Sequence, residues 1–287
     1  MSKALIKPEE LIENPLDVAR FVASQRAQES ARPDALIHDP LALQLAGERG
    51  EALMRSYRQD RADARGIGLR TRVHDEIITH LIEQEQLDAV ICLGTRFDTR
   101  PYRLTLSAQL RWIEADLPEI IAYKEENLSG ETPSCLLERV ALDVTDAEAR
   151  EVFFAETCAG VRKALLITEG LLAYLTEAQV STLSQDLYAQ EKIGWWLMEM
   201  ITPVSLRNQA NVWNELVSEC AQLRFAPLNG CSFFTEHGWE VAEFRSLVAE
   251  ALRLELPLRR KWLVRLLVRL NRHNINHTDG FVLFKHA

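Results

Sequence analysis

Short apolar runs alternate along this chain with longer stretches in which apolar residues recur at helical spacing. Such runs are typical of buried strands, and strands that alternate with helices predict a mostly parallel sheet with helices packed on both faces. The fold class expected from this pattern is therefore α/β. We expect strands near 90–93, 111–116, 140–144, 164–168 and 195–200, and two closing strands at 252–256 and 280–285.

The N-terminal part of the chain indicates helices rather than strands. Residues from about 16 to 63 suit helices that are broken by Pro33 and by Asp39-Pro40, and Gly66 precedes an amphipathic helix. That helix carries an apolar stripe of Val73, Ile77, Ile78 and Leu81. We expect a single unit with an N-terminal helical cap at 1–65, a core at 66–202, an inserted helical lid at 203–232 and a completion of the core at 233–287.

A glycine turn follows the first apolar run. Gly94 lets the backbone leave the strand in a conformation that most residues resist. Asp98 or Thr99 can cap a helix just after it, and Pro101 suits the first turn of that helix. Backbone N–H groups at such a helix start attract anionic or polar parts of a ligand. The turn therefore predicts the nucleotide-binding corner of a Rossmann-like sheet.

Acidic residues end the next expected strands. Asp116 lies about 20 positions after Gly94, where a ribose-binding carboxylate is expected. Asp143 and Glu169 follow two further strands, and the carboxyl ends of parallel strands meet at one edge of a sheet. Each of these acids could instead cap a helix. A nicotinamide dehydrogenase would use a similar corner, but it usually needs G-x-G-x-x-G, of which this chain keeps only Gly94.

Three motifs follow one another along the chain. They are Leu93-Gly94 with Asp98-Thr99-Arg100 and Tyr102-Arg103-Leu104, then Glu114-x-Asp116-Leu117-Pro118-Glu119 with Lys124, then Thr168-Glu169-Gly170-Leu171-Leu172-x-Tyr174-Leu175. In this order they resemble the leucine carboxyl methyltransferase family, and the resemblance covers roughly residues 26–181. The bacterial branch of that family includes S-adenosylmethionine-dependent O-methyltransferases of polyketide pathways.

The resemblance implies a class I methyltransferase sheet with an antiparallel last strand, S-adenosyl-L-methionine as cofactor, and a set of cofactor contacts. Arg72 would hold the cofactor carboxylate, which suits the paired hydrogen bonds of a guanidinium. The other implied contacts are Gly94 to the methionine part, Asp116 to the ribose, Asp143 and the backbone of Val144 to the adenine, and Glu169 near the methionine amino group.

One position departs from the family pattern. The family usually has a second glycine two residues after the first, and this chain has Arg96 there. Its side chain could block close approach to the backbone, or it could contact the cofactor carboxylate. A non-catalytic cofactor-binding or scaffold protein is therefore an alternative to an active enzyme.

Methyl transfer to oxygen depends on positioning, so few catalytic residues are expected. A carboxylate acceptor is already ionised, whereas a phenol or alcohol would benefit from a base. Tyr174 and His237 are the candidates, with a packing role for Tyr174 and a surface role for His237 as alternatives. The eukaryotic branch typically reads Asp-Leu-Arg-Asp where this chain has Asp143-Val144-Thr145-Asp146. The missing basic side chain favours a small-molecule acceptor over a protein C-terminal carboxylate.

Composition limits which binding partners and which cellular location we expect. The net charge of −9 argues against a nucleic-acid substrate, and five cysteines without a C-x-x-C pair suggest neither a disulfide framework nor a metal site. No signal peptide or long apolar segment is evident, so we expect a cytoplasmic protein. Residues 259–272 predict a basic amphipathic helix, which favours packing on the domain or a second subunit over contact with a membrane surface.

Overall fold

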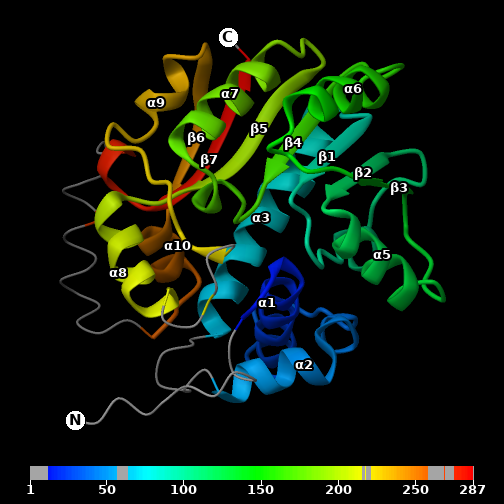
Figure 1. Ribbon diagram of the computed structural model, residues 1–287, viewed down its shortest axis with the longest axis vertical. Helices are drawn as coiled ribbons and strands as arrows, with labels where there is room; N and C mark the ends of the chain where they lie inside the picture. The colour runs from blue at the N-terminus through cyan, green and yellow to red at the C-terminus, as the bar shows by residue number, and fades with distance from the viewer. Residues whose placement is uncertain are drawn as a thin grey trace.

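The computed structural model describes residues 12–56, 64–214, 217, 221–257, 268 and 275–286, and the basic helix predicted for 259–272 lies outside these residues except for Val268. A seven-stranded sheet in the order β3-β2-β1-β4-β5-β7-β6 forms the centre of the fold (Figure 1). Its strands are β1 (Ala89–Leu93), β2 (Arg111–Asp116), β3 (Leu136–Ala141), β4 (Ala164–Thr168), β5 (Ile193–Met200), β6 (Trp239–Ser246) and β7 (Gly280–His286).

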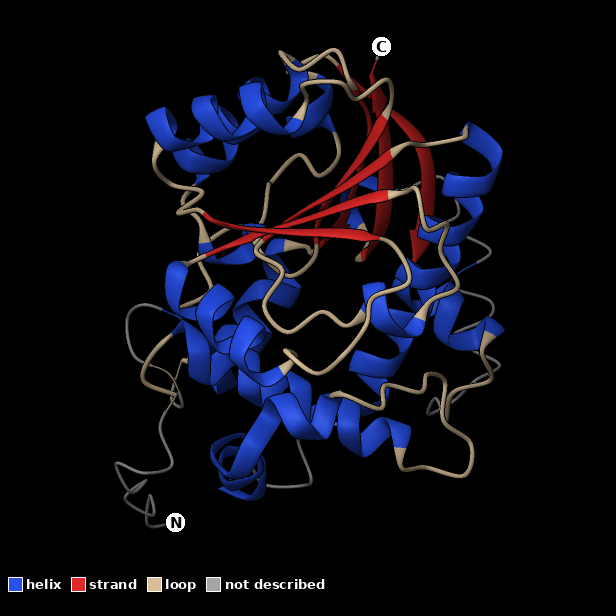
Figure 2. Cartoon of the chain, turned by 90° about the vertical axis from the view of Figure 1, so that its right-hand side faces the viewer, coloured by secondary structure: helices blue, strands red, loops and turns tan. Residues whose placement is uncertain are grey.

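The strand directions confirm the expected architecture. β1 to β5 pair in parallel, β7 is antiparallel to β5, and β6 is antiparallel to β7. The chain therefore has the α/β fold of class I methyltransferases, with an antiparallel strand after the fifth. Figure 2 shows the twist of this sheet and the helices on either side of it.

The strand expected at 252–256 is wrong. Helix α10 (Leu247–Arg253) includes the first two residues of that segment, and a turn follows, in which the Leu254 N–H donates to the Glu250 carbonyl. Alternating leucines mimic the period of a strand there, but only Leu252 belongs to the helix, which packs beside β6 and β7, while Leu254 and Leu256 follow it and pack in the core. The sixth strand is β6, whose buried Trp239 starts it at the edge of the sheet.

Helices cover both faces of the sheet, as the alternation along β1 requires. Val90 and Cys92 pack in the same cluster as residues of α3 and α10, whereas Ile91 and Leu93 pack with residues of α6 and α7 on the other face. The helices are α3 (Ala64–Glu85), α4 (Arg100–Arg103), α5 (Pro118–Asn127), α6 (Ala147–Thr157), α7 (Glu177–Tyr188), α8 (Pro203–Trp213), α9 (Ser232–Thr235) and α10, with short 3-10 turns η2 (Leu172–Tyr174) and η4 (Ile275–His277).

Two N-terminal helices, α1 (Pro15–Ser30) and α2 (Ala42–Ser56), pack together at one end of the molecule (Figure 1). The Asn14 side chain caps α1 by accepting the Asp17 N–H. Arg26 joins this pair of helices to the sheet, because its guanidinium pairs with Asp39 at 2.8 Å and donates to the Phe97 carbonyl at 2.5 Å. The turn after β1 is thereby held against α1. None of the described helices has the length and apolar character that crossing a bilayer requires.

Candidate active site

The turn after β1 has the geometry that its glycine predicts. Gly94 has φ of 65°, in the left-handed region, and its N–H donates to the Ala115 carbonyl at 2.9 Å. A Cβ at this position would lie 2.9 Å from the Leu171 Cδ1 atom. Only glycine therefore fits between the β1 turn and the loop that follows β4.

Asp116 is tied to this turn through the backbone. Its Oδ2 atom accepts the Arg96 N–H at 2.6 Å, and its Oδ1 atom accepts the Leu117 N–H at 2.8 Å. Burial raises the pKa of Asp116, and these two backbone hydrogen bonds only partly offset the effect. The carboxylate thus has a fixed orientation at the end of β2, beside the glycine turn.

Glu169, at the end of β4, lies between two arginines. Its Oε2 atom is 2.7 Å from Arg100 Nη2, and its Oε1 atom is 3.0 Å from Arg70 Nε. Burial opposes ionisation of Glu169, but the charges of Arg100, His74 and Arg70 outweigh it, so the pKa of this carboxyl lies well below its usual range. Glu169 is an anion held in place on both sides.

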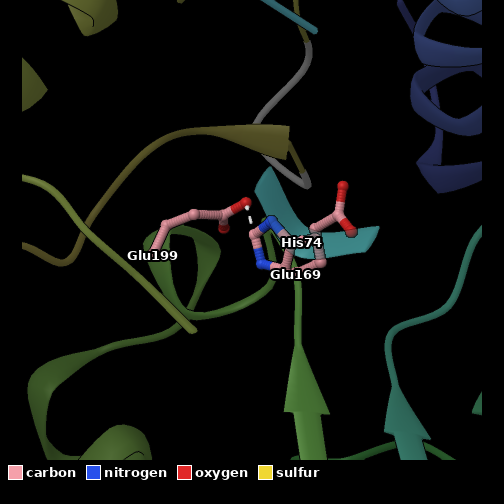
Figure 3. A group of neighbouring side chains, drawn as sticks. All are labelled: His74, Glu169 and Glu199. Carbon is pink, nitrogen blue, oxygen red and sulfur yellow. Dashed lines mark ion pairs between the residues drawn. The ribbon is translucent and has the colours of Figure 1, made fainter. Parts of the chain in front are cut away.

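Glu199, at the end of β5, extends the charged cluster towards α3. It accepts the Gly170 N–H at 2.6 Å, and its Oε1 atom lies 3.4 Å from Arg70 Nε and 3.8 Å from His74 Nε2. Figure 3 shows its carboxylate turned towards the His74 ring. The sequence reading missed Glu199, although an acid in an otherwise apolar strand is a signal that could have found it.

His74, Glu169 and Glu199 offer ligand atoms within 4.8 Å of one another, close enough for a metal ion. Arg70 is an ion-pair partner of both carboxylates, at 3.0 and 3.4 Å. A guanidinium therefore already supplies the positive charge between them, and we assign no metal to this cluster.

Two cavities meet at this edge of the sheet. The small one, of about 30 Å³, is lined by Gly94, Asp98, Arg100 and Glu169 among others. The large one, of about 1030 Å³, extends from the β4–α7 loop towards α1, α3, α8 and α10. Both cavities are lined by Val22, Arg70 and Arg96, which form the partition between them.

The cavities include some of the sequence-predicted residues and not others. Gly94 and Glu169 line the small cavity, and Tyr174 lines the large one. His237 lines neither; its Nε2 atom lies 3.2 Å from the Ser181 hydroxyl, and its ring packs on Phe233. The structure therefore offers no position for His237 as a base in either cavity.

Arg72 also lies outside both cavities. Its side chain is 48% exposed and pairs with Glu76 one helical turn away, at 2.7 Å. Arg70, two residues earlier on α3, lines both cavities instead. Residues two apart on a helix point to nearly opposite sides, so only one of these arginines can reach the site. Arg70 therefore places a guanidinium at these cavities, and a contact between Arg72 and the cofactor carboxylate stays a prediction.

Asp143 and Val144 lie in the turn between β3 and α6. The Asp143 carboxylate is exposed and accepts the N–H and the hydroxyl of Thr145, while the Val144 carbonyl accepts a hydrogen bond from Arg150 at 2.7 Å. Neither residue lines the small or the large cavity. Their contact with an adenine ring stays a prediction.

The motifs and this geometry agree with the family comparison. The model of the family "Leucine carboxyl methyltransferase" matches residues 19–187. This chain belongs to that family. The family match covers most of α1 and of α7, the glycine turn, Asp116 and Glu169, and thus includes every described residue that lines the small cavity.

Relatives of this leucine carboxyl methyltransferase family member are named as S-adenosyl-L-methionine-dependent methyltransferases. A protein from Mycobacteroides abscessus is 35% identical over 194 residues, which are 64% of this chain and 59% of that relative. A protein from Parafrankia sp. is 30% identical over 266 residues, which are 81% of this chain and 79% of that relative. The chain is therefore an enzyme of the S-adenosyl-L-methionine-dependent methyltransferase class.

Solved structures share the fold at low sequence identity. A DUF574 family protein from Streptomyces avermitilis has a TM-score of 0.61 and 13% identity, covering 94% of this chain and 97% of that chain. A protein from Thermobifida fusca described as a methyltransferase has a TM-score of 0.61 and 14% identity, with 98% and 97% covered. The whole architecture, including the N-terminal helices, is thus found in other chains.

Proposed function

We propose that this methyltransferase acts on a carboxylate or hydroxyl oxygen of a small molecule with a large apolar body, such as a polyketide-like compound. The observation that carries the proposal is the pairing of the two cavities. A polar one beside Gly94 and Glu169 shares the lining residues Val22, Arg70 and Arg96 with a much larger one, which is also lined by residues such as Phe21, Trp213 and Phe225. The volume of the larger cavity, about 1030 Å³, is close to the upper end of the range for small-molecule pockets.

The residues of the small cavity suit the methionine end of the cofactor. Gly94 lines this cavity without a side chain, and Glu169 is an ionised acid that can accept from an ammonium group. Arg70 and Arg100 provide guanidinium groups for a carboxylate. When bound, S-adenosylmethionine supplies a methyl group on a sulfonium. The chain has to orient that group towards the large cavity and keep water away from it.

The large cavity suits an apolar acceptor. Segment 203–232 contributes Asn208 and Trp213 from α8, and Phe225, to its wall. Met198 and Leu172 approach from the sheet side of the same cavity. Apolar side chains on opposite walls can hold a hydrophobic body in one orientation and exclude water, which is how a site of this kind accelerates a displacement reaction.

A protein C-terminal carboxylate is the less favoured acceptor. The turn that carries a basic residue in the eukaryotic branch has Val144 and Thr145 here, and Asp143 in the same turn is exposed and outside the cavities. The acidic net charge of −9 disfavours a nucleic-acid acceptor. A small molecule that enters the large cavity meets neither objection.

Calorimetric titration with S-adenosylmethionine, S-adenosylhomocysteine and, as a control, NAD tests the first half of the proposal. We expect S-adenosylmethionine and S-adenosylhomocysteine to bind and NAD not to bind. Release of S-adenosylhomocysteine on addition of apolar acids, phenols or alcohols tests the second half. If millimolar cofactor does not bind, the chain has lost the activity of its family and the scaffold alternative is correct.

A further inference from the structure

Arg96 stands where the family usually has a glycine, and its backbone still has a glycine-like conformation. Its φ is 46°, which few residues with a side chain adopt. The Arg96 N–H donates to Asp116, so the backbone of this residue completes the glycine turn on the cofactor side. The side chain is therefore an addition to an otherwise intact turn.

The Arg96 guanidinium lies on the large-cavity side of the partition. Its Nη2 atom donates to the Gly170 carbonyl at 2.7 Å, and its Cζ atom lies 5.0 Å from the centre of the Tyr174 ring. Gly170 and Tyr174 line the large cavity and not the small one. The charged end of Arg96 is thus directed towards the expected acceptor rather than the methionine end of the cofactor.

The arginines that line the large cavity differ in their partners. Arg70 is paired with Glu169 and Glu199, and Arg65 is paired with Asp34. Among the residues that the structure describes, no carboxylate forms an ion pair with the Arg96 guanidinium, which bonds to a carbonyl and lies over a ring. A guanidinium has a planar fork of N–H donors, and within the described part of the chain the Gly170 carbonyl accepts from one of those of Arg96.

The acids of the large cavity are already engaged. Glu199 accepts the Gly170 N–H and pairs with Arg70. Asp279 accepts the Thr202 N–H at 2.7 Å and the hydroxyl of Ser205. These carboxylates have other partners, and the charge of Arg96 acts on Asp116 only from a distance beyond an ion pair, so the Arg96 guanidinium can pair with a ligand carboxylate.

We propose that Arg96 binds the carboxylate of the acceptor and makes this enzyme selective for amphipathic carboxylic acids. This inference rests on the proposed function, of which it names the substrate class. A fork of N–H donors matches a carboxylate, and Trp213, Phe225 and Phe281 offer apolar walls for the rest of the molecule. One carboxylate oxygen bonds to the methyl carbon as the carbon–sulfur bond breaks, its electron pair stays on sulfur, and no proton moves. The product is a methyl ester, and no base is needed.

Binding of model acids tests the proposal without turnover. Decanoate and naphthoate, each compared with its methyl ester, are titrated into wild type and Arg96→Gln, with and without saturating S-adenosylhomocysteine. We expect wild type to bind at least one acid more tightly than its ester. In Arg96→Gln the affinity for that acid falls about ten- to a hundredfold, the range for a hydrogen bond between charged groups, while ester and S-adenosylhomocysteine affinities stay constant. Arg96→Lys keeps the charge and retains part of the preference.

Three outcomes would overturn the proposal: neither acid binds better than its ester, Arg96→Gln leaves acid binding unchanged, or Arg96→Gln weakens S-adenosylhomocysteine binding instead. The last result would place Arg96 in the cofactor site. Thermal unfolding confirms that the variant is folded. If wild type binds the acid through Arg96 but does not bind S-adenosylhomocysteine, the acid site stands and the proposed function fails, so the two failures are distinguishable.

Discussion

The Asp116 carboxylate accepts a 2.6 Å hydrogen bond from the backbone N–H of Arg96, which joins the end of β2 to the turn after β1. The spacing between a glycine turn and a strand-end acid, visible in the sequence, thus corresponds to a direct contact. Because β1 and β2 are parallel neighbours with Leu93 opposite Ala115, the two strand ends lie side by side. The bond fixes both the turn and the carboxylate at the expected cofactor site.

The first prediction compares Asp116→Ala with Asp146→Ala. Both carboxylates accept two backbone N–H groups, but Asp146 is the exposed N-cap of α6. We expect Asp116→Ala to weaken S-adenosylhomocysteine binding by about 1–3 kcal/mol, the range for losing a hydrogen bond to a charged group. Asp146→Ala should cost about 1 kcal/mol of folding stability and leave the binding unchanged. Calorimetry and urea unfolding separate these effects, and equal losses of binding would contradict a cofactor role for Asp116.

The second prediction concerns the space beside Gly94. Gly94→Ala introduces a Cβ at positive φ, and this atom meets Leu171. Gly160→Ala also introduces a Cβ at positive φ, of 74°, but no atom lies within 4 Å of it. Both variants carry the backbone cost, of roughly 1–2 kcal/mol. Only Gly94→Ala adds a steric cost, on the order of 1 kcal/mol. Urea unfolding of the two variants should show this difference, and equal destabilisation would mean that Leu171 yields freely.

The helix α3 shows why the sequence located the guanidinium only approximately. Arg70 stands three residues before Val73 and seven before Ile77, so it lies on the same side as the apolar stripe that packs on the sheet. Arg72 lies on the opposite side. The resemblance implied Arg72, and helical periodicity is the signal that distinguishes it from Arg70. The carboxylate partners Glu169 and Glu199 come from β4 and β5, and no local pattern reveals such pairing.

The third prediction compares the replacement of Arg70 by Met with the replacement of Arg72 by Met. Arg70→Met removes a cation from between two partly buried carboxylates and should lower the free energy of unfolding by about 3 kcal/mol. Arg72→Met breaks an exposed pair with Glu76 and should change it by no more than about 0.5 kcal/mol. Denaturant unfolding measures both. Similar values for the two variants would show that Arg70 is not required by the cluster.

The central strands could be predicted from the pattern of apolar residues. The strands at the centre of the sheet are buried on both faces, so they appear as continuous apolar runs. β6 is at the edge, and its alternation from Trp239 to Phe244 is interrupted by an irregular register between Val241 and Glu243. A bulge shifts the period of two, and the more regular alternation at 252–256 was misleading. The partition residue Arg96 was found only as a departure from the family motif.

The fourth prediction is an acid sensitivity that depends on Glu169. Burial raises the pKa of this carboxyl, but the charges of Arg100, His74 and Arg70 lower it by more than burial raises it. The pKa of Glu169 therefore lies well below the ordinary value in the folded state. A group of this kind stabilises the fold at pH above its unfolded pKa of about 4.3, and that stabilisation is lost as the pH falls through the folded pKa. Urea unfolding from neutral pH down to about pH 3 should therefore show a steeper loss of stability for wild type than for Glu169→Gln. Glu126→Gln, at an exposed position of α5, should follow wild type. Parallel pH profiles for wild type and Glu169→Gln would show that Glu169 is not held as an anion by its arginines.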